Sequence, residues 1–289
     1  MRELEFIGLY CAVCHHYDST LASYAQRTSN NFCPKFSDEE CIATLIWGIA
    51  NQKFDVKRCY EFIKDFYSDW FPNLPSYQTY NKRICFLADA FKSLAGVLLA
   101  KFGLDESHAD FIYDSMPIVV AGASRSSSAR VAPELCNKGY NASKKMWYYG
   151  VKLHILAQGN YKAMPTPAVM TISKASEHDL SIADQMLDDV KNIRVFADMA
   201  LLDKEWQTQM MTENNVEIIT PVKREKGQEC LSSADRLFSC AVSSVKQAIE
   251  SLNNWIIEKT NIQRASKVRS AEGLCVFLFA RIACACFMF

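Results

Sequence analysis

Three acidic residues stand where their side chains could act together. Asp114 and Asp198 each follow a short apolar run, and Glu250 lies inside a segment with helical spacing, 243–258. If these segments form one sheet with a helix across it, the three carboxylates converge, and carboxylate oxygens are ligands that Mg²⁺ prefers. Two such ions about 3.5 to 4 Å apart activate an attacking oxygen and stabilise a leaving one. The three acids therefore predict metal-dependent phosphoryl transfer.

The sheet that must hold these acids is predicted to begin near residue 109, where apolar spacing changes from helical to alternating. Within the expected strand 149–157, Lys152 and His154 alternate with apolar residues, which predicts a half-buried strand with a basic face. Three strands come first and helices then alternate with strands, an order that predicts an α/β fold with a mixed five-stranded sheet flanked by helices. The expected strands cover 111–114, 149–157, 167–172, a run ending at 198, and 216–221, and the expected helices cover 180–190, 203–214 and 243–258.

The first 105 residues have helical spacing and no strand-like alternation. Ser37, followed three residues later by Glu40, predicts a capping box at the start of a helix. Further helices are expected over 56–67 and after Ser76 toward Leu99. We therefore expect a helical domain, 1–105, followed by an α/β catalytic domain, 106–289.

The role of the helical domain has two interpretations. The polar opening of its last helix, 77–83, would suit the major groove of DNA. Residues 1–113 hold 11 basic and 14 acidic side chains, a net charge of −3 that disfavours strong phosphate binding. DNA binding and, equally, dimerisation or packing against the catalytic domain therefore remain the alternatives for this domain.

Basic side chains are unevenly distributed although the formal net charge of the chain is zero. Residues 114–289 hold 21 basic and 18 acidic side chains, and the segment 115–174 holds eight basic residues and one acid, Glu134. Such runs are usually solvated surface, but these flank the proposed carboxylates, which favours contact with a phosphate backbone. The candidate contacts are Arg125, Arg130, Lys138, Lys144, Lys145, Lys152, His154, Lys246, Lys259 and Arg264.

Export and membrane insertion are both disfavoured by the sequence. The amino terminus carries acids where a secretory signal carries bases. The apolar run 274–289 contains Arg281 and is shorter than the roughly 20 residues that span a bilayer, so we expect a buried terminal helix. We therefore expect a cytoplasmic protein whose twelve cysteines are reduced. The Cys-x-x-Cys-His-His run at 11–16 leaves haem attachment, a zinc site and a plain helical face open, and we favour the last.

Several short motifs follow one another in order through the second part of the chain. They are Asp114-Ser115-Met116-Pro117, Lys138-Gly139-Tyr140, the run from Trp147 to His154, His178-Asp179, Asp198, and Lys246 with Glu250 four residues later. Together these motifs resemble the ribonuclease-H-like catalytic domain of bacterial insertion-sequence transposases of the DDE type. The segments 36–40 and 71–75 are similar to the helical leader domain of a compact subgroup of these transposases.

The resemblance implies a role for each acid and a partner for the chain. Asp114 would bridge two Mg²⁺ (or Mn²⁺) ions, and Asp198 and Glu250 would each bind one of them. The implied reactions are hydrolytic release of 3′ ends at terminal inverted repeats and transfer of the 3′-hydroxyl into target DNA. A homodimer on DNA, associated with the nucleoid in the cytoplasm, is expected because two element ends must be brought together.

The sequence departs from the family pattern beside the second and third acids. Met199-Ala200 stands where the family usually has a Gly-Tyr turn, Ser243 where it often has tyrosine, and Ile257 where it often has lysine. Three alternatives therefore stay open: a decayed transposase that binds without cutting, a helical DNA-binding regulator, and a nuclease of the same fold that cuts without joining.

Overall fold

The computed structural model describes residues 2–27, 34–103, 109–142, 144–160, 163–225 and 227–289. Backbone contacts divide the chain into two compact units. The helical unit comprises Met1–Leu99, Arg130–Glu134 and Ile256–Phe289, and the α/β unit comprises Ala100–Ala129 and Leu135–Trp255. We expected residues 106–289 to form one domain. In this division the carboxyl-terminal helix instead belongs to the helical unit, because it contacts two amino-terminal helices.

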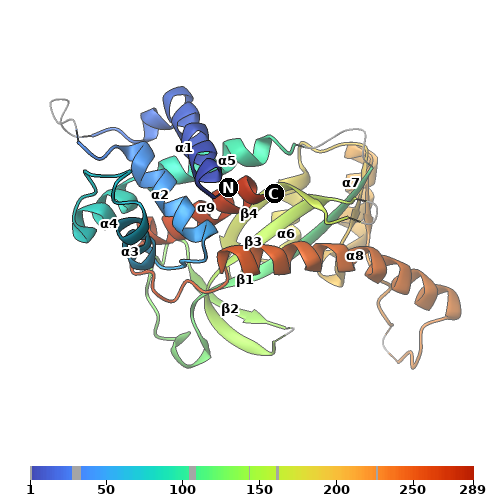
Figure 1. Cartoon of the computed structure of the whole chain (residues 1–289). Coiled ribbons are helices and arrows are strands. Elements are labelled where there is room, and N and C mark those ends of the chain that lie inside the picture. The colour runs from blue at the N-terminus through green and yellow to red at the C-terminus, as the bar shows by residue number, and fades with distance from the viewer. Residues whose placement is uncertain (1, 28–33, 104–108, 143, 161–162, 226) are drawn as a thin grey trace. The chain divides into compact units, whose positions relative to one another are not determined.

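Among the residues that the structure describes, six α-helices build most of the helical unit, and α2 contacts four of the others. The capping box at α2 is present, since the Ser37 hydroxyl accepts from the Glu40 N–H and the Glu40 carboxylate accepts from the Ser37 N–H. The helix expected from Ser76 toward Leu99 is interrupted at Leu87. The helices are α1 (Arg2–Ser19), α2 (Asp38–Ala50), α3 (Val56–Phe66), α4 (Tyr77–Phe86), α5 (Ala88–Ala100) and α9 (Ala271–Met288), with a short 3₁₀ helix at Leu21–Tyr24 (Figure 1).

The helix α9 carries a buried guanidinium group that ties it to its own unit. Arg281 donates hydrogen bonds to the carbonyl oxygens of Thr260 (3.0 Å) and Phe277 (3.0 Å), and also to that of Phe54. Among the described residues, α9 is the one helix long and apolar enough to cross a membrane by length and composition. Half of it is buried inside the protein, as expected for a terminal core helix.

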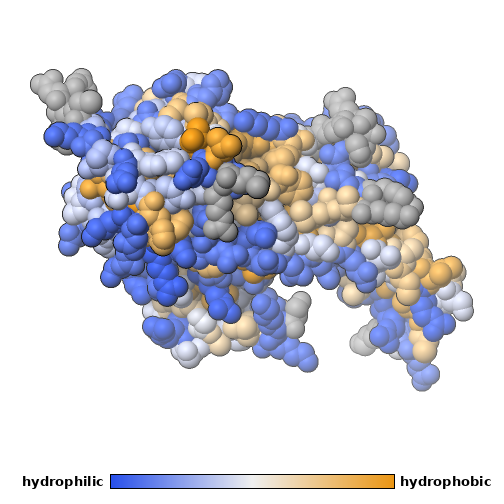
Figure 2. Space-filling view, viewed as in Figure 1, coloured by the Kyte–Doolittle hydropathy of each residue, from blue (hydrophilic) through white to orange (hydrophobic). Residues whose placement is uncertain are grey.

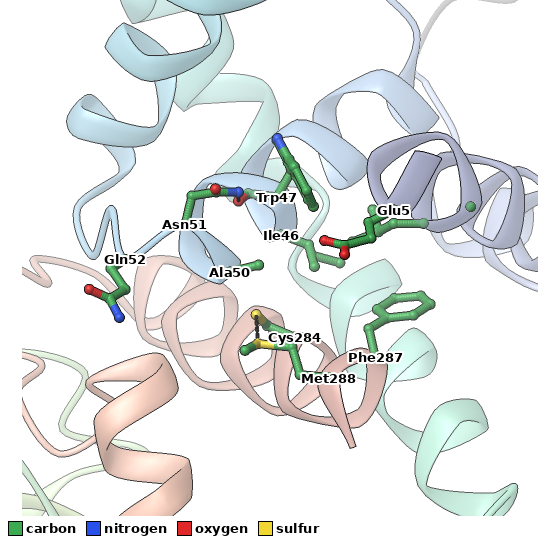
Figure 3. Close-up of a pocket in the computed structure, with 11 residues that line it drawn as sticks. Glu5, Ile46, Trp47, Ala50, Asn51, Gln52, Cys284, Phe287 and Met288 are labelled. Carbon is green, nitrogen blue, oxygen red and sulfur yellow. Dashed lines mark hydrogen bonds between the residues drawn. The ribbon is translucent and has the colours of Figure 1, made fainter. Parts of the chain in front are cut away.

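A pocket of about 690 Å³ lies between α1, α2 and α9 (Figure 3). Its walls mix apolar side chains, such as Leu9, Ile46 and Phe287, with the polar Glu5, Asn51 and Gln52. None of the candidate catalytic or DNA-binding residues lines it. Pocket size alone therefore does not identify the catalytic site of this chain.

The α/β unit is built on one mixed sheet. Strand β3 pairs antiparallel with β1 on one side, and on the other with β2 near its start and with β4 further along. Strands β1, β5 and β6 run parallel to one another. The strands are β1 (Asp110–Ala121), β2 (Asn137–Asn141), β3 (Met146–Gln158), β4 (Thr166–Lys174), β5 (Ile193–Phe196) and β6 (Val216–Ile219). In the described part of the chain the sheet thus has six strands, and the expectation of five lacked β2, whose Asn-Lys-Gly-Tyr-Asn sequence has no apolar alternation.

Helices cover both faces of this sheet. Phe111 and Tyr113 of β1 belong to a buried cluster with residues of α6 (Asp179–Leu187) and α7 (Lys204–Asn214). Because side chains alternate along a strand, Asp114 lies on the opposite face. The helix α8 (Ser233–Thr260) runs along that face (Figure 1). A mixed sheet with helices on both faces is consistent with the ribonuclease-H-like fold that the sequence predicts.

Candidate active site

The register of two parallel strands places Asp114 beside Asp198. Ile112 of β1 pairs with Phe196 of β5, and each acid follows its strand partner by two residues. Neighbouring strands lie about 4.8 Å apart, so the backbone alone brings the two carboxylates to one edge. The sequence suggested that Asp114 ends its strand, but β1 continues beyond it to Ala121 with β3 as its partner. Its parallel pairing with β5, however, ends at Ile112.

Two polar side chains of α8 contact this pair of acids. Lys246 forms an ion pair with Asp198, and the side-chain amide of Asn253 donates a 2.7 Å hydrogen bond to Asp114. Lys246 and Asn253 are buried, whereas the Asp198 side chain is 65% exposed. The two acids therefore contact a buried ammonium group and a buried amide group of α8, while the Asp198 side chain is also open to solvent.

The environment of Asp114 disfavours its charged form. The pKa of Asp114 is raised to about 6, mainly by burial. The positive charge of Lys246 lowers this pKa, and the negative charge of Asp198 raises it. Two carboxylates close together favour a shared cation or a shared proton. Lys246 supplies that cation from within the chain.

Replacing Lys246 by methionine should raise the pKa of Asp114 above its value of about 6, since the variant loses the positive charge that opposes the effect of burial. Carboxyl-labelled aspartate followed by NMR over a pH series measures the change, with Asp114→Asn assigning the signal. Lys191→Met, at an exposed position outside this site, serves as the control. An unchanged Asp114 titration in Lys246→Met would show that the ammonium group does not act on this carboxylate.

Glu250 stands apart from the other two acids in its surroundings. It lies one helical turn after Lys246 and one turn before Asn253, which places it on the same side of α8. Glu250 is exposed. Across the part of the chain that the structure describes, no three His, Cys, Asp or Glu side chains lie close enough to hold a metal ion. That finding covers the Cys-His run of α1 as well, and in this structure Asp114 and Asp198 form a pair that Glu250 does not join.

A second polar network holds the strand residues on either side of Asp114. The Asp179 carboxylate at the start of α6 accepts hydrogen bonds from Ser115 (2.9 Å) and Lys152 (2.6 Å). The Tyr113 hydroxyl donates to the Asp179 carbonyl oxygen and lies 2.6 Å from Nδ1 of His154. Because these groups fix residues 113 and 115 on the opposite face, they hold Asp114 in position toward α8.

The burial of His154 corrects one expected DNA contact. Its side chain is 0% exposed, and its Nε2 lies 2.8 Å from the Ser173 hydroxyl. Burial lowers the pKa of His154 to about 4, so the ring is neutral at pH 7. Lys152 shares this face of the sheet and pairs with Asp179. His154 is therefore a structural residue, and Lys152 acts on Asp179 within the fold.

The remaining basic candidates lie in both units. Arg125, Lys138, Lys144 and Lys145 are exposed on loops and strand β2 of the α/β unit. Arg130 and Arg264 are exposed in the helical unit, where Lys259 lies 3.7 Å from the Glu258 carboxylate. These positions keep phosphate contact as a prediction for each of them.

Asn253 is the site residue that the sequence did not reveal. Its amide nitrogen donates to an acid 139 positions away, and its amide oxygen is buried without a hydrogen-bond partner among the described residues. Asparagine within a helix has no local pattern that marks such a contact. The polar sequence Asn253-Asn254 inside an apolar-periodic helix was the available signal, since a polar residue on a buried face requires a partner.

The family of the chain follows from a comparison with known proteins. A sequence profile described as Transposase DDE domain matches residues 106–270. Searches of curated proteins and of solved structures found no match. The matched segment contains Asp114, Asp198, Glu250 and all six strands. Since the profile covers more than half of the chain, this protein belongs to the transposase DDE domain family.

Proposed function

We propose that this chain is a DNA transposase that hydrolyses phosphodiester bonds at the ends of its element and transfers the released 3′-hydroxyl into target DNA. The observation that carries the proposal is that the parallel register of β1 and β5 brings Asp114 and Asp198 together, where both interact with the positive charge of Lys246. Family membership implies DNA as the substrate. Terminal inverted repeats and a homodimer that joins two ends belong to the same proposal.

The oxygen groups of the site fit a divalent cation, which transposase DDE domains generally use. Asp114 and Asp198 already share the positive charge of Lys246, and the buried Asn253 amide oxygen has no hydrogen-bond partner in the part of the chain that the structure describes. Carboxylate and amide oxygens are ligands that Mg²⁺ and Mn²⁺ accept. When bound, the metal supplies neutralisation of phosphoryl charge and activation of the attacking oxygen. We assign Asp114 and Asp198 as ligands, and Glu250 as the third ligand from the exposed side.

The other residues of the site position and balance these charges. The Asn253 amide orients Asp114 through its 2.7 Å hydrogen bond, and Tyr113 and Ser115 fix the strand from behind. Lys246 balances the negative charge of the two acids within the protein. If these acids held a divalent cation, the Lys246 ammonium group would be free to contact a DNA phosphate. The exposed lysines of the α/β unit supply further phosphate contacts.

The direct test is incubation of the purified protein with Mg²⁺ or Mn²⁺ and a duplex that ends in the inverted repeats flanking its own gene. Nicked 3′ ends and joined products are expected from the parent, and neither from Asp114→Ala, which lacks a metal ligand. Asp189→Ala, an exposed acid outside the site, should behave as the parent. Parent protein without products, or Asp114→Ala with the same products as the parent, would contradict the proposal.

A binding protein without cutting activity is the second candidate function. The observation that favours it is the ion pair of Lys246 with Asp198, which places a protein cation where the metal would be needed. Such a protein would bind the element ends and yield no metal-dependent product. A nuclease of the same fold would give nicks without joined products in the same assay.

A further inference from the structure

Two aromatic side chains are exposed on the ribbon formed by β2 and β3. Tyr140 and Trp147 pair directly across the ribbon, and their ring centroids lie 5.1 Å apart. Their exposed fractions are 51% and 50%, so a large part of each ring that could be buried by packing is open to solvent. The lobe that carries β2 shows a mixture of hydrophilic and weakly hydrophobic surface (Figure 2).

The fold prevents these rings from turning inward. The other face of the ribbon carries Tyr148, which is 2% exposed, and Gly139, where an added Cβ would overlap the carbonyl of Ala175. A slip of one residue would be needed to exchange the two faces. Tyr140 and Trp147 are therefore held outward by the packing of their neighbours.

Lysine residues lie on the same ribbon as the exposed rings. The Lys138 ammonium lies 4.8 Å from the Trp147 ring centroid and donates to the Ser127 hydroxyl. Lys144 and Lys145 are exposed in the turn that joins the two strands, where the Lys144 N–H donates to the side chain of Asn141. The sequence contains no Asp or Glu between residues 135 and 176. The ribbon thus combines aromatic faces with positive charge.

We propose that the β2–β3 ribbon is a stacking platform for unpaired nucleotides of single-stranded DNA. Nucleobases stack on exposed aromatic rings while lysines contact the phosphates, a combination that tolerates any sequence. In a duplex the base faces are already stacked on one another, so the rings would discriminate single strands from duplexes. The inference rests on the proposed function for its choice of DNA, and it adds unpaired nucleotides to the substrate.

The test measures binding of a fluorescently labelled oligothymidine to the full chain in EDTA, where no cutting occurs. Trp147→Ala should raise the Kd by about tenfold or more, and Tyr140→Ala by about fivefold or more, because each loses one stacking surface. Tyr24→Ala is the matched control, since Tyr24 is equally exposed at 51% in the helical unit. For a blunt duplex of equal length, Trp147→Ala should bind as the parent does.

The conservative variant separates stacking from folding. Trp147→Phe should keep the parent affinity and lose the part of the tryptophan fluorescence that oligothymidine quenches. Parent-like binding by Trp147→Ala, or an equal loss on single strand and duplex, would overturn the proposal. Because the assay contains no metal, a parent that fails to cut DNA would refute the proposed function and leave this result standing. A parent that cuts but binds independently of Trp147 would refute only the ribbon.

Discussion

Asp114→Asn should abolish DNA cutting and at the same time make the folded protein more stable at pH 8. The parent carries a carboxylate whose pKa is raised by burial to about 6, compared with 3.8 for an ordinary aspartate. Each unit of difference corresponds to about 1.4 kcal/mol, so keeping this group charged costs the folded state roughly 3 kcal/mol above pH 6. Asparagine preserves the shape without the charge and removes this cost.

The effect on stability has a defined pH dependence. Between about pH 4 and pH 6 the folded parent retains a proton that the unfolded chain has lost, so the contribution of Asp114 falls as pH rises through this window. The free energy of unfolding of Asp114→Asn should therefore match the parent near pH 4 and exceed it by a constant amount above pH 6. Urea unfolding in EDTA at several pH values measures this difference. A variant that is less stable than the parent at pH 8 would contradict the assignment of a desolvated carboxylate.

Asp38→Ala should destabilise the helical unit by roughly 3–5 kcal/mol. Asp38 is 5% exposed, and its carboxylate accepts hydrogen bonds from Arg27 (2.7 Å), Arg83 (2.6 Å) and the Tyr17 hydroxyl (3.0 Å). Removing one partner of a buried ion pair leaves the opposite charge without the group that compensated its loss of water. Asp38 also begins α2, where a negative charge is favourable.

Denaturant unfolding at pH 7 tests this expectation by comparison with an exposed ion pair. Glu61 lies 3.7 Å from Lys57, and both side chains are more than half exposed. Glu61→Ala should change the free energy of unfolding by less than about 0.5 kcal/mol. If Asp38→Ala lowered the free energy of unfolding as little as Glu61→Ala, the Asp38 carboxylate would not stabilise the packing of α2 with Tyr17 of α1, Arg27 and Arg83 of α4.

Local sequence patterns predicted much of the fold. The capping box of Ser37 with Glu40 and the alternation along β3 are visible within a few residues, because they depend on neighbours in the chain. The length of β1 was underestimated, since the expected strand 111–114 lacks the part of β1 that contains Pro117. Proline is tolerated there since β1 has left β5 by that point and retains only β3 as its partner.

The candidate site was predicted only in part, because its contacts join distant segments. Asp114 and Asp198 were identified through the motifs around them, and their proximity follows from strand register. The contacts of Asn253 with Asp114 and of Lys152 with Asp179 span 139 and 27 positions. No local spacing encodes such contacts, so the amide partner of Asp114 and the pairing of Lys152 required the three-dimensional structure.

The parallel register of β1 with β5 also determines where this chain can change in length. The separation of Asp114 from Asp198 depends on two short paired segments and not on the 80 or so residues between them. Insertions in the surface loops of that interval would cost little loop-closure entropy and leave the pair intact. A single inserted residue between Ile193 and Asp198 would turn the second acid to the other face of the sheet. Tolerance of insertions should therefore be high in the loops and absent in a stretch of about six residues.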